Sequence, residues 1–197
     1  MYKWNTEYRI IDNFLEPEDL EMCKKFFISA NAVYDKIPPT KKANWYVHKN
    51  GVEVNKHGKI LSYDIEDPYI LSLHVKYNDK LLEAMDELAP ERKKEYKQST
   101  IEFVSSRTGL KWKIHPDVSE KLLSAVIYVS PEQSTGTILC KDQEGLDPHE
   151  VKWKENRCLI FCQTDDSYHW YENFNEETRN TIAWNLRSTY DENYGDD

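Results

Sequence analysis

The sequence predicts an α+β protein that is mainly β, an antiparallel barrel or jelly roll covered on one side by N-terminal helices. Two helical patterns occupy the first half of the chain, and about eight short strand patterns separated by tight turns follow. Aromatic residues are abundant, with 13 Tyr, 6 Trp and 6 Phe, and they favour strands and ring-lined pockets. Helices followed by a run of strands indicate segregated layers rather than alternating βαβ units.

Length and charge narrow the class of protein further. A chain of 197 residues is long enough for one sizeable core, so we expect one domain over 1–197, with helical support in 1–95 and a β core in 96–190. The formal net charge is -9 and the basic residues are scattered, which argues against nucleic-acid binding. No stretch approaches the roughly 20 apolar residues of a membrane span. We therefore expect neither nucleic acid nor a membrane as a partner.

The cysteines and the first residues predict the compartment. Cys23, Cys140, Cys158 and Cys162 form no CxxC pair, and residues 1–7 lack the apolar core of a secretory signal. Free thiols suit a reducing compartment. We therefore expect a cytoplasmic protein.

Two helices are expected in the N-terminal half, after a strand that runs into a turn over 8–15. The first opens at Glu16-Pro17, because proline suits the first helical position, and the second opens at Asp67-Pro68 and ends before Pro90. His74 borders the apolar stripe of the second helix, and we expect a packed or solvated side chain there rather than a metal ligand. The stripes are Leu20, Cys23, Phe27 and Ala30 in the first helix and Ile70, Leu73, Tyr77, Leu81, Met85 and Leu88 in the second.

The intervening residues 34–66 show no sustained period. Pro38-Pro39, Asn50-Gly51 and His57-Gly58 are turn signals, so we expect a loop-rich region with one or two short strands. Long loops in compact domains often bind ligands, and the aromatic pair Trp45-Tyr46 is where we expect substrate contacts. The alternative is a surface excursion without a binding role.

The second half is a series of extended segments, and the last of them alternates strictly between two kinds of side chain. One face of it would line a site inside the barrel, and the other would lie under the helices. The first face is Arg179, Thr181, Ala183 and Asn185, and the second is Ile182, Trp184 and Leu186. The strand candidates are 98–104, 110–114, 122–129, 135–141, 151–153, 157–162, 168–171 and 179–186.

Three residues form a candidate metal site. His115 and Asp117 stand two apart at the end of a strand candidate, so an extended backbone directs both to one side. His169 follows after several strand candidates, which can return the chain to the same place. Two imidazoles and one carboxylate suit a borderline divalent ion such as Fe(II) and leave coordination positions open. A surface turn is the alternative for the His-x-Asp tripeptide taken alone.

Arg179 is a candidate anion-binding residue, ten residues after His169. Its planar guanidinium can bind a carboxylate through two parallel hydrogen bonds, and Thr181 on the same face can add a hydroxyl. The alternative is a surface salt bridge with the acidic residues of the turn 172–177.

Taken together, these motifs resemble the 2-oxoglutarate and Fe(II)-dependent dioxygenase superfamily, in particular its prolyl-4-hydroxylase-like branch. The order of His-x-Asp, His and Arg agrees with that family, and four further pieces spread over nearly the whole chain agree as well. They are the entry segment Ile10–Glu16, Gly109 six residues before His115, the strand Val126–Val129 and the segment Gly136–Leu139.

The resemblance implies a double-stranded β-helix, a jelly-roll or cupin-like fold, with iron held by His115, Asp117 and His169. It also implies that the keto acid end of 2-oxoglutarate chelates the iron, while its far carboxylate pairs with Arg179 and is reached by Tyr128. Reaction with O2 would then give succinate and carbon dioxide and would hydroxylate an unactivated C–H bond. Ascorbate is a further expected cofactor.

Three functions stay open at this point. The first is hydroxylation of a prolyl or other residue in a protein or peptide, and the second is the same chemistry on a free amino acid or another small metabolite. The third is a non-catalytic jelly-roll protein that binds ligands or has a structural role. Ser106 and Trp112 stand where prolyl hydroxylases often carry tyrosines, so part of the pocket departs from the family. The retained Asp117 argues against the halogenating branch, and arginine at 179 is typical of the oxygen-sensing type.

Overall fold

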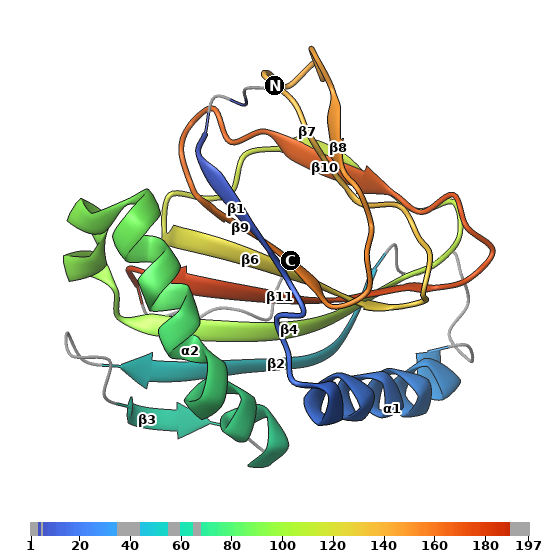
Figure 1. Ribbon diagram of the computed structural model, residues 1–197, viewed down its shortest axis with the longest axis horizontal. Coiled ribbons are helices and arrows are strands. Elements are labelled where there is room, and N and C mark those ends of the chain that lie inside the picture. Colours follow the sequence, from blue (N-terminus) through green and yellow to red (C-terminus); the bar gives the residue numbers. More distant parts are fainter. Residues whose placement is uncertain (1–3, 5, 35–43, 55–59, 65–67, 190–197) are drawn as a thin grey trace.

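Two antiparallel β-sheets face each other, and two α-helices lie outside the larger sheet (Figure 1). The computed structural model describes residues 4, 6–34, 44–54, 60–64 and 68–189, with the backbone alone for 29–34, 44–54 and 60–64. The elements in chain order are β1 (Tyr8–Asp12), α1 (Pro17–Tyr34), β2 (Asn44–Val54), β3 (Ile60–Asp64), α2 (Pro68–Leu88), the 3-10 helix η2 (Pro90–Glu95), β4 (Gln98–Ser106), β5 (Lys111–His115), β6 (Lys121–Ser130), β7 (Thr137–Leu139), β8 (His149–Val151), β9 (Arg157–Cys162), β10 (His169–Glu172) and β11 (Arg179–Arg187).

The strand order places β11 at the centre of the larger sheet. Within the described residues, the larger sheet has the order β1-β9-β6-β11-β4-β2-β3 and the smaller sheet has the order β5-β10-β7-β8. β11 pairs along its length with β4 on one side and with β6 on the other. Both edges of β11 are thus paired, and its alternating side chains point to opposite faces of the sheet, one toward the helices and one toward the smaller sheet.

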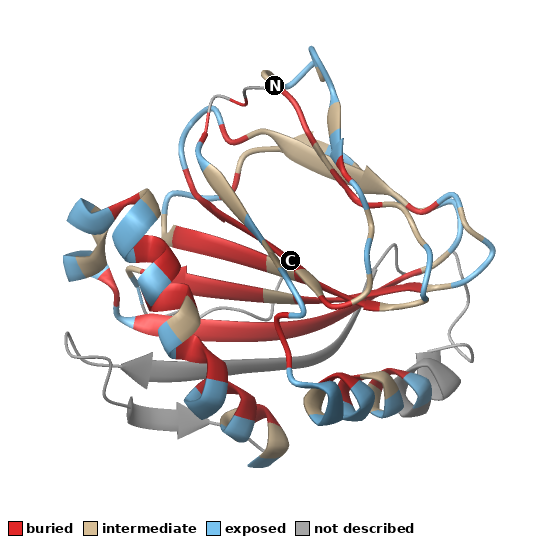
Figure 2. Ribbon diagram, viewed as in Figure 1, coloured by how far each residue is buried: buried red, intermediate tan, exposed pale blue. Residues whose placement is uncertain are grey.

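The main core lies between the larger sheet and the helices, and it gives α1 and α2 one buried face each (Figure 2). Pro17 and Pro68 are the first residues of these helices, as the sequence predicts. The apolar face of β11 packs into this core, which confirms the predicted placement of Ile182, Trp184 and Leu186. Neither of these α-helices has the length and apolar character needed to cross a membrane, among the residues that the structure describes.

A smaller core between the two sheets is closed by the N-terminal segment. Trp4 packs edge-on against Phe161 with ring centroids 5.4 Å apart, and its indole nitrogen donates to the Cys140 carbonyl oxygen at 2.8 Å. Phe161 in turn packs against the His169 ring, with centroids 4.9 Å apart. The N-terminal segment therefore supports the strand that carries one of the candidate metal ligands.

Among the described residues of 34–66 the expected strands are present as β2 and β3, but β2 is longer than the short strand that the sequence predicts. β2 runs over eleven residues and pairs with β4 from Asn44 to Glu53, and β3 continues the sheet. The turn signal Asn50-Gly51 lies inside β2 rather than at a turn. The edge of β4 supplies a hydrogen-bonding partner, and this long-range pairing outweighs the local turn preference.

Smaller differences concern the ends of elements. The strand predicted to run into a turn over 8–15 is β1, which ends at Asp12. The strand predicted over 151–153 is β8, which ends at Val151. Residues 91–95 form part of η2.

Candidate active site

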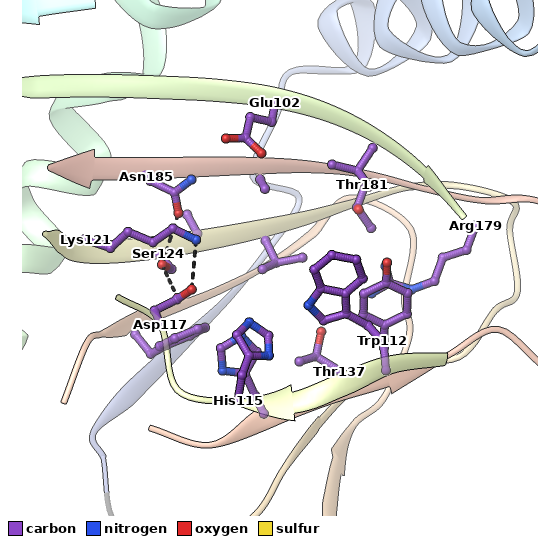
Figure 3. A pocket seen from close by; sticks show the side chains of 17 residues that line it. Glu102, Trp112, His115, Asp117, Lys121, Ser124, Thr137, Arg179, Thr181 and Asn185 are labelled. Atoms are coloured by element: carbon purple, nitrogen blue, oxygen red, sulfur yellow. Dashed lines mark hydrogen bonds and ion pairs between the residues drawn. The ribbon is translucent and has the colours of Figure 1, made fainter. Parts of the chain in front are cut away.

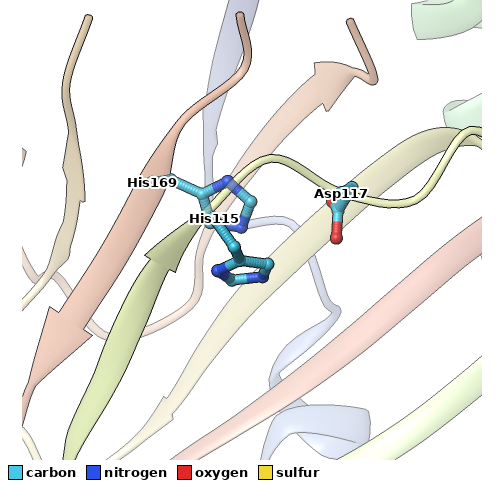
Figure 4. A group of neighbouring side chains, drawn as sticks. All are labelled: His115, Asp117 and His169. Carbon is cyan, nitrogen blue, oxygen red and sulfur yellow. The ribbon is translucent and has the colours of Figure 1, made fainter. Parts of the chain in front are cut away.

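The three candidate metal ligands lie together on the smaller sheet (Figure 4). His115 is the last residue of β5, His169 is the first residue of β10, and the two are cross-strand partners. Their ring centroids are 4.5 Å apart. Asp117 follows β5, and the ligand atoms of the three residues all lie within 4.8 Å of one another. The structure thus brings together the residues that the sequence predicts for one metal site.

Both imidazole rings have their Nε2 atoms available for a metal. Nδ1 of His115 lies 3.0 Å from the Lys113 carbonyl oxygen, and Nδ1 of His169 lies 2.9 Å from that of Ser167. A carbonyl oxygen can only accept, so each Nδ1 carries the proton and each Nε2 keeps its electron pair. Burial, together with the neighbouring His169, lowers the pKa of His115 to about 4, and burial also lowers the pKa of His169. Both rings are therefore neutral near pH 7, the form that binds metal ions.

Asp117 is held as a carboxylate by two neighbours. The Lys121 ammonium donates to Oδ1 at 2.8 Å, and the Ser124 hydroxyl donates to Oδ2 at 2.6 Å. Burial raises the pKa of Asp117, but the charge of Lys121 and the two hydrogen bonds outweigh it and hold that pKa well below its usual range. Ser124 Oγ also lies 3.1 Å from Oδ1 of Asn185, which ties the carboxylate to β11.

Arg179 opens β11 and is 1% exposed. Its Nε donates to the Thr135 carbonyl oxygen at 3.1 Å, and its guanidinium carbon lies 4.1, 5.3 and 5.6 Å from the ring centroids of Tyr171, Trp153 and Tyr128. Within the described residues, Nη2 has no hydrogen-bond partner and no carboxylate pairs with the guanidinium. Burial lowers the pKa of Arg179. The alternative of a surface salt bridge is therefore wrong, because the side chain is buried.

The metal cluster and Arg179 line the same cavity, which has a volume of about 140 Å³ (Figure 3). Arg179 lies at one end of the lining, and Lys121 and Asn185 lie at the other. The polar face of β11 follows the cavity, so the predicted inward placement of Arg179, Thr181, Ala183 and Asn185 is confirmed. Other side chains that line the cavity are Glu102, Val104, Trp112, Thr137, Phe161 and Tyr171.

The two hydroxyl residues expected to assist Arg179 differ in their placement. Thr181 lines the cavity beside Arg179. Tyr128 is fully buried behind the cavity: its hydroxyl donates to Thr137 Oγ1 at 3.0 Å, and its ring stacks on Trp153 at 4.5 Å between centroids. Contact of either residue with a ligand stays a prediction.

Tyr171 is a cavity residue that the reading of the sequence overlooked. It stands two positions after His169 on β10, so alternation along the strand directs both side chains to one face. This spacing is the signal that could have identified it. The expected substrate contacts at Trp45-Tyr46 lie on β2, where the side chains are outside the described residues.

Comparison with known proteins identifies the fold. No protein-family model and no curated protein matches the chain. Its structure is similar to a prolyl-4-hydroxylase from Pseudomonas putida, with a TM-score of 0.62 and 12% identity over 93% of each chain. A prolyl hydroxylase from Trichoplax adhaerens, solved in complex with a hypoxia inducible factor oxygen degradation domain peptide fragment, gives a TM-score of 0.59 at 12% identity, over 93% of this chain and 84% of that one.

A third similar structure has a broader description. It is an oxidoreductase of the 2OG-Fe(II) oxygenase family from Burkholderia pseudomallei, with a TM-score of 0.57 at 9% identity, over 92% of this chain and 84% of that one. Identities of this size establish similarity of fold. The chain has the double-stranded β-helix fold of the 2-oxoglutarate and Fe(II)-dependent oxygenases, in the form found in prolyl hydroxylases.

Proposed function

We propose that this protein is a non-haem Fe(II)- and 2-oxoglutarate-dependent oxygenase that hydroxylates an unactivated C–H bond. The fold supports the proposal, and so does the combination of a His-Asp-His cluster with a buried cation in one cavity. Neither feature is sufficient alone. A jelly-roll protein without a catalytic role would not require both the metal cluster and the buried cation.

The burial of the Arg179 guanidinium without a paired carboxylate among the described residues is the observation on which the proposal rests. A buried guanidinium loses much of its hydration, and no carboxylate in the described part of the chain offsets this cost. A carboxylate that enters the cavity would accept charge-assisted hydrogen bonds from Nη2. Because the metal cluster lines the same cavity, the matching ligand is a short organic acid with a metal-chelating group at its other end. 2-Oxoglutarate has this form.

The donor set supports Fe(II) as the metal. Two neutral imidazoles and one carboxylate match its preference for nitrogen and oxygen ligands, and three protein ligands leave positions for a chelating keto acid and O2. The backbone carbonyls that bond Nδ1 of His115 and His169 fix both rings with Nε2 toward the metal position. His115, Asp117 and His169 would therefore supply the three protein ligands of the ion.

Each part of the cavity has a separate task in this chemistry. When bound, Fe(II) supplies the redox chemistry by which O2 and 2-oxoglutarate give succinate, carbon dioxide and a hydroxylated substrate. Arg179 fixes the far carboxylate of the co-substrate, and Thr181 is placed to add a hydrogen bond. The rings of Trp112 and Phe161 narrow the cavity and limit the access of water.

A residue in a protein or peptide is the substrate class that we propose. The Trichoplax adhaerens prolyl hydroxylase was solved with a peptide, and its similarity of fold supports a peptide substrate here. The same cavity would serve a free amino acid or another small metabolite. Screening peptides and free amino acids for a gain of one oxygen atom by mass spectrometry separates the two classes.

Formation of succinate tests the proposed reaction. We expect succinate from 2-oxoglutarate in the presence of Fe(II) and O2, and we expect loss of this activity in His115→Ala and His169→Ala, which each remove a metal ligand. His149→Ala is the matched control, because this histidine lies on β8 and does not line the cavity. Equal succinate formation by wild type and His169→Ala would contradict the proposal.

A further inference from the structure

A tyrosine ring forms the wall of the cavity beside Arg179. Tyr171 lies on β10 two residues after His169, and both side chains line the cavity. A two-residue step along a strand is about 6.6 Å. Tyr171 therefore lies a short distance along β10 from a candidate metal ligand.

The Tyr171 ring is fixed at its face and at its hydroxyl. The guanidinium carbon of Arg179 lies 4.1 Å from the ring centroid, the shortest of the cation–ring distances around that side chain. The hydroxyl is hydrogen-bonded to Ser106 Oγ at 2.8 Å, and Ser106 is fully buried. Ser106 is also the cross-strand partner of Arg179. The ring thus bridges the two sheets, and it cannot move aside without losing one of these contacts.

Tyr128 does not have this position. Its hydroxyl is bonded to Thr137 and its ring is stacked on Trp153, behind the cavity lining. Of the two tyrosines that the structure describes next to Arg179, Tyr171 is the one that a ligand in the cavity would touch.

We propose that Tyr171, held by Ser106, sets the chain length of the keto acid that this site accepts. The inference rests on the proposed function, because it concerns the co-substrate of that reaction. A keto acid that reaches from the metal cluster to Arg179 must pass along the Tyr171 ring. One additional methylene would have to displace this ring, and a close-fitting pocket discriminates one methylene by roughly 10-fold to 200-fold.

The experiment compares two keto acids that differ by one methylene. Fe(II)-loaded protein is titrated anaerobically with 2-oxoglutarate and with 2-oxoadipate, and the ratio of the two dissociation constants is measured. We expect wild type to favour 2-oxoglutarate at least about tenfold, and Tyr171→Leu to bring the ratio close to one. Tyr171→Phe, which keeps the ring but loses the hydrogen bond to Ser106, should lower the ratio by a smaller factor. Trp170→Leu, which changes an aromatic residue of β10 outside the cavity lining, should keep the wild-type ratio.

Ser106→Ala provides a second route to the same answer if Tyr171→Leu does not fold. It releases the hydroxyl of the ring, so the ratio should fall in the same direction by a smaller factor. An unchanged ratio in either folded variant overturns the inference. So does a folded Tyr171→Leu protein that binds neither keto acid, because Tyr171 would then be needed for binding rather than for selecting length. Failure of wild type to bind any keto acid would instead overturn the proposed function itself.

Discussion

At the scale of single residues, Arg179 combines deep burial with a donor group that lacks a partner in the described part of the chain. The stacked rings of Tyr171, Trp153 and Tyr128 offset part of the cost of burying its charge. A matching carboxylate would offset more of it. The buried guanidinium should therefore favour ligand binding but lower the stability of the ligand-free protein.

Arg179→Met should separate these two demands. Loss of the guanidinium should weaken 2-oxoglutarate by about 2–5 kcal/mol, because a buried charge pair would be lost. Removal of a buried charge should stabilise the ligand-free protein by roughly 1–4 kcal/mol. Anaerobic titration and urea unfolding measure the two effects, and Arg179→Lys, which keeps the charge but not the planar fork, should bind with intermediate affinity. Unchanged affinity in Arg179→Met would mean that the carboxylate binds elsewhere.

Much of the candidate site could be predicted at this scale, because it depends on local alternation. The spacing of His115 and Asp117 and the inward face of β11 are properties of an extended backbone. The spacing of His169 and Tyr171 gives the same signal for Tyr171. The contact of its ring with Arg179 could not be predicted in this way, because it depends on how the two sheets pack in three dimensions.

At the scale of elements, β7 and β8 approach each other very closely at Gly136. A Cβ atom at this position would lie 1.9 Å from the Val151 carbonyl oxygen, so the two strands would have to separate. Thr137, the next residue, lines the cavity and bonds Tyr128. The shape of the cavity wall near Arg179 therefore requires glycine at position 136.

Gly136→Ala should destabilise the protein by roughly 1–3 kcal/mol through overpacking, and it should also weaken binding of 2-oxoglutarate. Gly109→Ala is the comparison. Gly109 has φ +76 and open space around its Cβ position, so alanine there should cost about 1–2 kcal/mol of backbone strain without affecting the cavity. Urea unfolding and anaerobic titration of both variants check this, and wild-type stability in Gly136→Ala would contradict the account.

The contact between α2 and the sheet contains a histidine that burial keeps neutral. His74 stacks on Trp184 with ring centroids 6.0 Å apart, and neither of its ring nitrogens has a hydrogen-bond partner among the described residues. Burial lowers the pKa of His74 to about 4, while Asp79 opposes this shift. Of the two placements expected from the sequence, packed or solvated, the structure shows the packed one.

Acid should therefore destabilise the α2 contact. The unfolded chain takes up this proton near pH 6.5 and the folded chain only near pH 4, so stability is lost as the pH falls through this window and is unaffected above it. The loss should reach about 3 kcal/mol, and His74→Phe should abolish this part of it. Urea unfolding at pH 7 and pH 4.5 measures the difference, with His149→Ala as the control. The same acid dependence in wild type and His74→Phe would contradict this assignment.

Helices and central strands could be predicted from the sequence, while the length of β2 could not. The start of each helix depends on a nearby proline, and the strands of the core depend on local apolar patterns. β2 contains Asn50-Gly51, which is a turn signal when read locally. Its extended form depends on hydrogen bonds to β4, a strand about 50 residues later in the chain.

At the scale of the whole molecule, the candidate site joins the two sheets. His115 and His169 come from the smaller sheet, and Arg179 comes from the larger one. A ligand that binds the metal and Arg179 together should therefore stabilise the packing of one sheet on the other. The fold class predicted from the sequence is confirmed, because segregated helices and strands leave few architectures. The single-domain organisation, the location and the substrate stay predictions.

Thermal unfolding should respond to the combination of ligands. At a ligand concentration about 100 times the dissociation constant, binding stabilises the folded state by about 2.7 kcal/mol. For a chain of this size each 1 kcal/mol raises the Tm by roughly 2–4 °C. We expect a larger increase with Fe(II) and 2-oxoglutarate together than with either alone, measured without oxygen. An identical increase in His169→Ala would show that the ligands bind at another site.

The central claim is that Fe(II) and 2-oxoglutarate bind together between the His-Asp-His cluster and Arg179. Anaerobic titration followed by visible absorption tests it most directly, because chelation of Fe(II) by a keto acid gives a weak metal-to-ligand charge-transfer band. We expect this band in wild type only when both components are present, and we expect it to be absent in His115→Ala and His169→Ala. No band in correctly folded wild-type protein, or a full band in either variant, would contradict the account.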